Sequence, residues 1–382
     1  MKIKFLVFIF SLFVFLNFAT FSYAEPRDSV DYKETFVRGK VMEVLNQGLK
    51  SFNGVSVYSE KLKVNILEGQ EKGKIVIIDR STDPRLSNTK ISKGEGVVID
   101  VKPDPKGVTQ YVIYEPYRLN SLLIIAAIFL LFVIFIAGRR GIGAVIGLTI
   151  SVLVISLWII PQILAGADPL RVCIVGSFVI LIITTYIAHG VSLKTTVAIL
   201  GTAISLVFAA WLSNFLVSIL HVFGLGSEDI YNLQIGTPNP INPSGLLLGS
   251  ILIGTLGALN DITTTQAMTM FTLVKESASR RTEQKMLDLF EKGMIIGKEH
   301  IASLINTLVL AYAGSSLAIF IFFELNPAHL PWWVILNNES TIEEIVRSLV
   351  GAGSLIFAVP LTTLIATWVA LKGKKAISAL NQ

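Results

Sequence analysis

Long apolar stretches dominate the chain from about residue 119 to residue 371. Each could cross a bilayer, because a hydrocarbon core of about 30 Å needs about 20 mostly apolar residues in a helix. Turns and charged residues separate about seven such stretches, so we predict an α-helical polytopic membrane protein with about seven transmembrane helices. The predicted spans are residues 121–137, 142–164, 170–188, 195–223, 244–261 or somewhat beyond, 301–323 and 345–371.

The first apolar run has the pattern of a leader. Lys2 and Lys4 precede the run, and Ser22-Tyr23-Ala24 places small residues before Glu25. This is the arrangement that a signal peptidase recognises. We therefore expect a signal peptide at residues 1–24, with a retained signal anchor as the alternative. In both cases the following segment is delivered outside the cytoplasm.

Residues 25–118 change to a charged, turn-rich pattern with short alternating strands. Such alternation between turn residues is typical of half-buried strands. We expect an extracytoplasmic domain that is a small closed β-barrel of the OB or SH3-like kind, because closure removes the exposed edges of a short sheet. A ligand-binding role and a structural role both remain open. The candidate strands are residues 35–45, 62–67, 74–79, 96–101 and 110–115.

Basic residues predict the orientation of the spans. With the N-terminal domain outside, alternation places Arg139, Arg140, Lys194, the segment 275–298 and the tail 372–382 in the cytoplasm. An excess of Lys and Arg in short cytoplasmic loops is the expected asymmetry. We predict a multi-pass protein of a bacterial cell membrane with a cytoplasmic C-terminus. The segment 275–298 is predicted to form a cytoplasmic helix.

Composition supports the membrane assignment and excludes several functions. Apolar residues make up 52% of the chain and charged residues 15%, whereas soluble domains contain about a quarter charged residues. The net charge of +5 is concentrated beside the spans and in the N-terminal region, so we expect no nucleic-acid partner. One cysteine permits no disulfide or cysteine metal site. Because common enzyme motifs are absent, we expect no enzyme, no metal and no cofactor.

The fifth span carries the densest group of polar residues. Gly254 and Gly257 let neighbouring helices approach, and Asn260, Asp261, Thr264 and Thr265 follow. An ionised aspartate near the middle of a bilayer costs at least a few kcal/mol, so it suggests a functional role. The alternative is that the span ends near residue 259 and that Asp261 caps the next helix.

A second polar group opens the sixth span. His300 and Asn306 lie near Ser303 and Thr307 on neighbouring helical positions. Asp261 and His300 could form a protonatable pair, because histidine titrates in the physiological range. The alternative places His300 in water at the cytoplasmic interface.

Other positions suggest helix packing and a helix kink. Gly143 and Gly147 form a GxxxG pattern that is typical of close helix packing. Pro360 in the last span should kink the helix and free a carbonyl group, which could line a pathway or only shape the bundle.

Three sequence blocks resemble the YibE/F-like family of bacterial membrane proteins. They are GTLGALNDITTTQA at 254–267, IGKEHIAS at 296–303 with NTLVLAYAG at 306–314, and AVPLTT at 358–363. The resemblance implies a leader, an extracytoplasmic region and a multi-span body, and no established activity. One departure is the run Ser315-Ser316-Leu317-Ala318, which lacks the expected proline and so removes the usual reason for a helix break.

The combined pattern favours a permease-like protein that moves a small solute or ion, with proton coupling as an option. The alternative is a non-transporting receptor or assembly component whose outer β domain binds an envelope ligand. A lipid-modifying enzyme has less support because no nucleophile and base are paired. The expected partners are the lipid bilayer, the solute or ion, and a second membrane protein or another copy of the chain.

Overall fold

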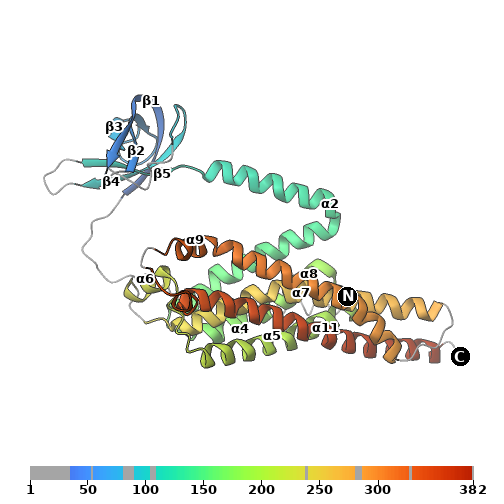
Figure 1. Cartoon of the computed structure of the whole chain (residues 1–382). Helices are drawn as coiled ribbons and strands as arrows, with labels where there is room; N and C mark the ends of the chain where they lie inside the picture. The colour runs from blue at the N-terminus through green and yellow to red at the C-terminus, as the bar shows by residue number, and fades with distance from the viewer. Residues whose placement is uncertain are drawn as a thin grey trace. The chain divides into compact units, whose positions relative to one another are not determined.

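The structure, a computed structural model, describes residues 35–52, 55–80, 90–103, 109–236, 240–279, 286–326 and 329–380 (Figure 1). The predicted signal peptide lies outside these residues. The chain divides into two units, a β-rich unit at residues 24–132 and a helical unit that contains residues 133–382.

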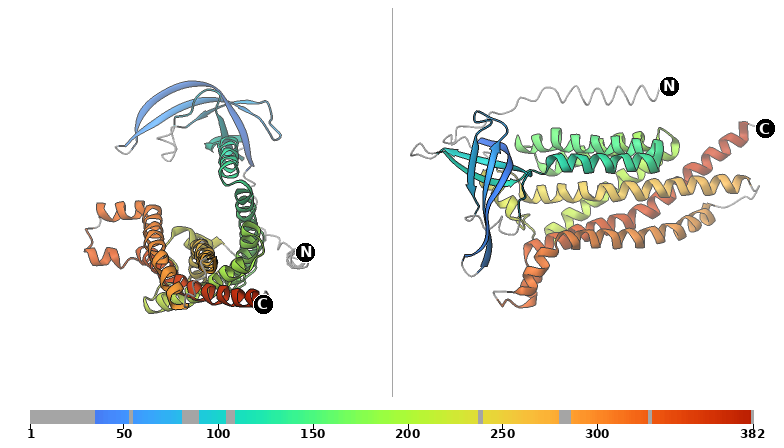
Figure 2. Two further views of the ribbon diagram at one scale, coloured as in Figure 1. Left: turned by 90° about the vertical axis from the view of Figure 1, so that its right-hand side faces the viewer. Right: turned by 90° about the horizontal axis from the view of Figure 1, so that it is seen from above.

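Five antiparallel strands form one curved sheet in the β-rich unit (Figures 1 and 2). Their order is β3-β2-β1-β4-β5, so the long strand β1 lies in the centre. The prediction of five strands is confirmed, although β1 and β2 extend well beyond the predicted segments. The strands are β1 (Thr35–Phe52), β2 (Val55–Ile66), β3 (Ile75–Asp79), β4 (Gly96–Pro103) and β5 (Thr109–Pro116).

The sheet is a half-barrel whose described strands do not close. β3 and β5 are its two edges and do not pair. Tyr111 in β5 nevertheless reaches the turn before β3, where the Lys74 ammonium donates a hydrogen bond to its hydroxyl at 2.6 Å. Hydrogen bonds from Lys74 and Tyr111 also hold the pKa of Glu71 below its usual value. Closure is therefore incomplete, and side chains rather than backbone pairing bring the two edges together.

Alternating side chains build the core of this unit on the concave face. Val76 and Ile78 of β3 point inward while their neighbours are exposed. An ion pair is buried beside this core: the Arg80 guanidinium lies 2.8 Å from Glu60, and both side chains are at most 3% exposed. The backbone N–H of Arg80 also donates to the Glu60 carbonyl group at 3.0 Å.

Glu60→Ala should destabilise the β-rich unit by about 3–5 kcal/mol, because the change leaves the Arg80 guanidinium buried without this carboxylate. Hydrogen exchange of residues 35–116 in the full-length protein would measure the loss. The matched control is Glu43→Ala, since Glu43 pairs with Lys63 at 4.0 Å on the surface and should change stability by about 1 kcal/mol at most. Equal effects of the two changes would contradict the prediction.

The first long helical segment bends at one glycine. α2 (Leu119–Val154) continues through a π-helical turn, η2 (Ile155–Ile159), into α3 (Ile160–Leu164). Gly138 has φ 56° and ψ −132°, which is not helical, and such a conformation strongly favours glycine. A side chain at Gly141 would lie 2.6 Å from the Val133 carbonyl oxygen, so the chain turns back tightly here.

Six described helical segments are long and apolar enough to cross a membrane. The prediction of about seven spans is not confirmed, because the first two predicted spans form one segment, Leu119–Leu164, with the bend at Gly138 inside it. The helices that follow are α4 (Pro169–His189), α5 (Leu193–Ile219), α6 (Glu228–Gly236), α7 (Pro243–Ser279), α8 (Met286–Ser315), α9 (Leu317–Leu325), α10 (Trp332–Leu336) and α11 (Glu339–Leu380).

Three boundaries differ from those predicted. α7 runs through Asp261 without a break, so the interpretation of Asp261 as a helix cap is wrong. The predicted helix at 275–298 is instead the end of α7 and the start of α8, on either side of residues outside the described ranges. Ser316 separates α8 from α9 with φ −98° and ψ 10°, so the helix breaks there although no proline is present.

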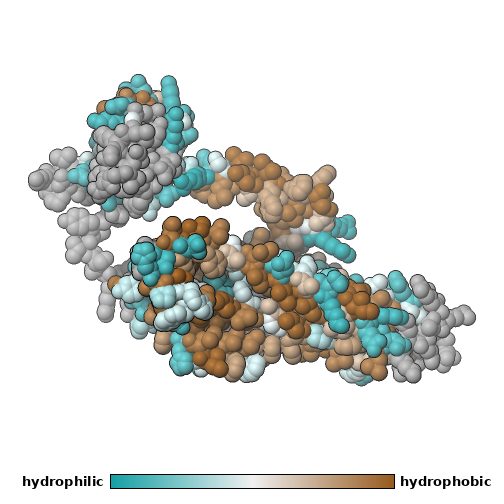
Figure 3. All heavy atoms as spheres, in the orientation of Figure 1, coloured by the Kyte–Doolittle hydropathy of each residue, from teal (hydrophilic) through white to brown (hydrophobic). Residues whose placement is uncertain are grey.

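α7 is the central helix of the helical unit. It packs against α4, α5, α8 and α11 (Figures 1 and 2). Leu252, Leu259 and Ile262 of α7 are fully buried in the shared apolar core. Apolar side chains also cover much of the visible outer surface of the helices (Figure 3). Such a surface is expected for helices in contact with hydrocarbon.

Candidate functional site

A line of polar side chains, half-buried at Asn260 and buried beyond it, follows one side of α7. Asn260, Thr263 and Gln266 are spaced by three residues, so they lie on neighbouring turns of one face. The Thr185 hydroxyl of α4 donates to the Asn260 side-chain oxygen at 2.8 Å. The hydroxyl groups of Thr202 in α5 and Thr263 are 2.6 Å apart. We call these residues, together with Gln266 and its partner Thr363, the polar seam.

Gln266 connects three helices and is fully buried. Its amide nitrogen donates to the Gly293 carbonyl oxygen of α8 at 2.8 Å and to the Thr363 hydroxyl of α11 at 2.7 Å. Its amide oxygen has no hydrogen-bond partner among the described residues. A buried acceptor without a partner costs roughly 1–3 kcal/mol, so it requires an explanation.

Glycines make this close packing possible. Gly293 lies against Met270, and Gly297 lies against Val359 and the Gln266 amide, so neither position has room for a larger side chain. On the other side of α11, Gly201 of α5 accommodates the Thr362 hydroxyl. Small residues at helix contacts allow the backbones to approach within hydrogen-bonding reach of polar side chains.

Other buried polar groups around α7 also lack partners among the described residues. They include the hydroxyl groups of Thr255 and Thr264 in α7, the Thr362 hydroxyl in α11, and the Nδ1 atom of His300 in α8. These groups come from three helices and are not shown to converge on one point. They make the interior of the helical unit rich in hydrogen-bonding groups that no atom of the described residues satisfies.

A different face of α7 is exposed. Gly254, Gly257, Asp261 and Thr265 follow one another at helical spacing and are all exposed in the described structure. A side chain at Gly257 would meet no atom within 4 Å, and one at Gly254 would meet only the Tyr312 hydroxyl at 3.5 Å. The predicted role of these two glycines in close helix packing is therefore not seen. Gly143 and Gly147, in contrast, lie against Ile187, Ala188 and Thr184 of α4.

Asp261 has an electrostatic neighbour on α4. The Asp261 carboxylate acts electrostatically on His189 at the end of α4, as do Arg140 and Lys194. The Thr185–Asn260 hydrogen bond explains this position, since it joins α4 and α7 one turn before His189. No hydrogen bond or ion pair joins Asp261 to His300 among the described residues.

The other predicted site residues are dispersed. His300 is half-buried on α8, while Asn306 on the same helix is exposed. Pro360 is half-buried within α11, which remains helical through it. Pro360 lies beside the polar seam, because the neighbouring Val359 contacts Gly297 and Thr363 binds Gln266.

The sequence pattern did not single out the residues that hold the seam together. Gln266 ends the polar run of α7, and its distance from Asn260 and Thr263 could have placed it on their face. Gly293 forms a GxxxG pattern with Gly297, which is typical of close helix packing. Thr202 and Thr363 gave no such signal, because threonines are common in transmembrane helices. Among the described residues, no three His, Cys, Asp or Glu side chains are grouped as metal ligands.

Gln266→Leu should destabilise the helical unit by about 1–3 kcal/mol, because the Gly293 carbonyl loses its buried donor. Thermal unfolding of the full-length protein in detergent would measure this loss. Thr272→Val is the control, since the exposed Thr272 hydroxyl bonds only to the Met268 carbonyl within its own helix. The prediction fails if both variants unfold at the wild-type temperature.

Comparison with known proteins identifies a family. A sequence model of the family described as YibE/F-like protein matches residues 125–372, roughly two thirds of the chain. The match covers the helices that carry the polar seam. No curated protein and no solved structure matches the chain.

Proposed function

The chain belongs to the YibE/F-like family, and we propose that it is a permease-like membrane protein that moves a small solute or ion. The observation that carries this proposal is the fully buried Gln266, whose amide oxygen has no partner among the described residues. Unpaired polar groups inside transmembrane helices are costly and are typical of ion and substrate pathways.

Asp261 supports the same function from the exposed face of α7. It lies about midway along a 37-residue helix, where a bare carboxylate in contact with hydrocarbon would cost a few kcal/mol. A hydrated path beside α7 would remove this cost. Asn260 of the polar seam is adjacent to Asp261, so a single turn of α7 would connect the hydrated path at Asp261 with the polar seam. Protonation of Asp261 would then provide the proton coupling.

The proposal includes a specific topology. The bend at Gly138 would divide Leu119–Leu164 into two spans, which gives seven in total. With the β-rich unit outside the cell, Arg139, Arg140 and Lys194 would lie in the cytoplasm. We further propose that the half-barrel is an OB or SH3-like domain, which the contact between Tyr111 and the turn before β3 supports.

Asp261→Asn should abolish transport without loss of folded protein. Full-length protein in liposomes, with entrapped pH-sensitive and potential-sensitive dyes, would report the movement of protons and of Na⁺ or K⁺. Wild-type protein should give a flux above empty liposomes, and Asp261→Asn should reduce it at least about tenfold because the carboxylate is lost. Asp288→Asn, which removes a carboxylate near the start of α8, should keep the flux. Unchanged flux in Asp261→Asn would contradict the proposal.

The second candidate function is that of a receptor, and one feature of the β-rich unit favours it. Phe36 and Tyr114 form an exposed edge-to-face pair with ring centres 5.1 Å apart. Exposed aromatic pairs are common at binding surfaces. Asp100 lies opposite Phe36 in the sheet and is 5% exposed.

Changing both Phe36 and Tyr114 to Ser separates the two functions. If the helical unit forms the pathway, the double variant should keep the flux of the wild-type protein in liposomes, because both rings belong to the β-rich unit. A loss of flux in the double variant with intact folding, checked by circular dichroism and gel filtration, would contradict a pathway formed by the helical unit alone. Absence of flux from the folded wild-type protein would favour the non-transporting receptor.

A further inference from the structure

We propose that a cavity between α4, α5 and α7, separate from the polar seam, binds a small organic cation that carries an ammonium group. The cavity has a volume of about 430 Å³, which is within the range of small-molecule sites. It lies where the N-terminal ends of α4 and α7 meet the C-terminal end of α5. Its polar lining comes from Asp168, Asn214, Ser218, His221, Asn242 and Ser244.

The two helix N-termini at this cavity are already capped by their own side chains. Asp168 accepts a hydrogen bond from the Arg171 backbone N–H at 2.9 Å through Oδ1. Asn242 accepts one from the Gly245 backbone N–H at 3.2 Å. These contacts occupy donors that would otherwise attract an anion. They leave the Asp168 Oδ2 atom as an acceptor for a ligand.

The charge of the lining favours a cation. Asp168 is the one lining residue with a carboxylate, and no lysine or arginine lines the cavity. A second carboxylate, that of Glu339, lies next to the cavity. It accepts hydrogen bonds from the backbone N–H groups of Phe223, which lines the cavity, and of Leu225, at 2.8 and 3.1 Å. A lining with this charge attracts a positively charged ligand.

An aromatic ring and hydrogen-bond acceptors make an ammonium group the best fit. The Phe223 side chain lines the cavity and is 64% exposed, so its ring can contact a cation. Ser218 and Asn214 offer oxygen acceptors, and an ammonium group has three donors to distribute among them and Asp168. His221 adopts a left-handed backbone with φ 53°, a strained state that is frequent at binding sites.

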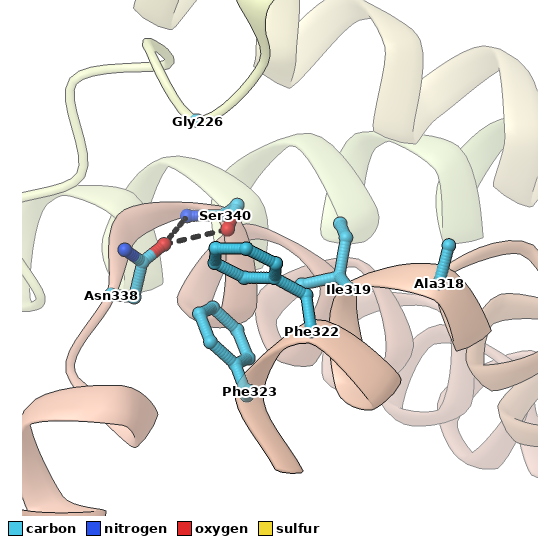
Figure 4. Close-up of a pocket in the computed structure, with 7 residues that line it drawn as sticks. All are labelled: Gly226, Ala318, Ile319, Phe322, Phe323, Asn338 and Ser340. Atoms are coloured by element: carbon cyan, nitrogen blue, oxygen red, sulfur yellow. Dashed lines mark hydrogen bonds between the residues drawn. The ribbon is translucent and has the colours of Figure 1, made fainter. Parts of the chain in front are cut away.

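A second cavity lacks this chemistry. It is lined by Ile319, Phe322 and Phe323 of α9, with Asn338 and Ser340 beside them (Figure 4). The Asn338 side-chain oxygen already accepts hydrogen bonds from the backbone N–H and the hydroxyl of Ser340. No charged side chain lines it. A charged ligand therefore discriminates between the two cavities.

Binding of ethylammonium to the full-length protein in nanodiscs of zwitterionic lipid tests the proposal. Isothermal titration calorimetry should detect saturable binding of ethylammonium and at least about tenfold weaker binding of acetate and ethanol, which lack the positive charge. Absence of saturable ethylammonium binding, or equal binding of acetate, would overturn the proposal.

Two variants locate the ligand. Asp168→Asn keeps a side chain that caps helices as well as aspartate does and should weaken ethylammonium binding at least about tenfold by removing the charge. Ser218→Leu should block binding by filling the cavity without changing a cap. Asp229→Asn is the control, because it removes an acidic residue of α6 that does not line the cavity. Wild-type binding by both Asp168→Asn and Ser218→Leu would overturn the assignment.

We further propose that this cavity is the access point for a transported solute. This role rests on the proposed function, whereas cation binding does not. Asp261→Asn should bind ethylammonium as the wild-type protein does, since Asp261 does not line the cavity. Normal binding with unchanged flux in Asp261→Asn would therefore contradict only the permease. Absence of ethylammonium binding to the wild-type protein would contradict only the cation site.

Discussion

Polar groups in the interior of a membrane protein have no water to bind, and this constraint organises the helical unit around α7. A polar side chain buried on α7 is stabilised by a partner on another helix. Thr185, Thr202 and Thr363 supply these partners from α4, α5 and α11. The hydrogen bonds therefore fix the rotation of α7 and its position along the neighbouring helices. Apolar packing alone would fix neither as strongly, because the lipid tails are as apolar as the side chains.

The glycines follow from the same constraint. Gln266 can reach the Gly293 carbonyl only if α7 and α8 approach closely, and Gly293 and Gly297 permit this approach. Where α7 has no close neighbour, its glycines serve no such contact, as at Gly257. The same residue type thus has two different consequences on two faces of one helix. A tightly packed seam and an exposed carboxylate lie one residue apart.

The β-rich unit solves a different problem. A five-stranded sheet has two edges, β3 and β5, which do not pair here. A hydrogen bond between Lys74, in the turn before β3, and Tyr111 of β5 connects them instead. The buried Glu60–Arg80 pair of this unit contrasts with the hydroxyl and amide groups of the polar seam. In both units, buried polar pairs join different elements of the fold. These pairs specify one arrangement of elements that burial of apolar area would leave less defined.

Hydropathy and alternation along the chain determined the class of protein, the five strands and most of the helices, because these patterns arise from local contact with hydrocarbon or a core. The family blocks likewise depended on sequence alone. The tertiary structure decided that α7 continues through Asp261, that α2 bends at Gly138 and that the Asp261 carboxylate acts electrostatically on His189 of α4. It also selected Gln266 as the central polar residue. These outcomes depend on which helices pack together and on their relative positions along the helix axes. A local pattern of residues does not determine that arrangement.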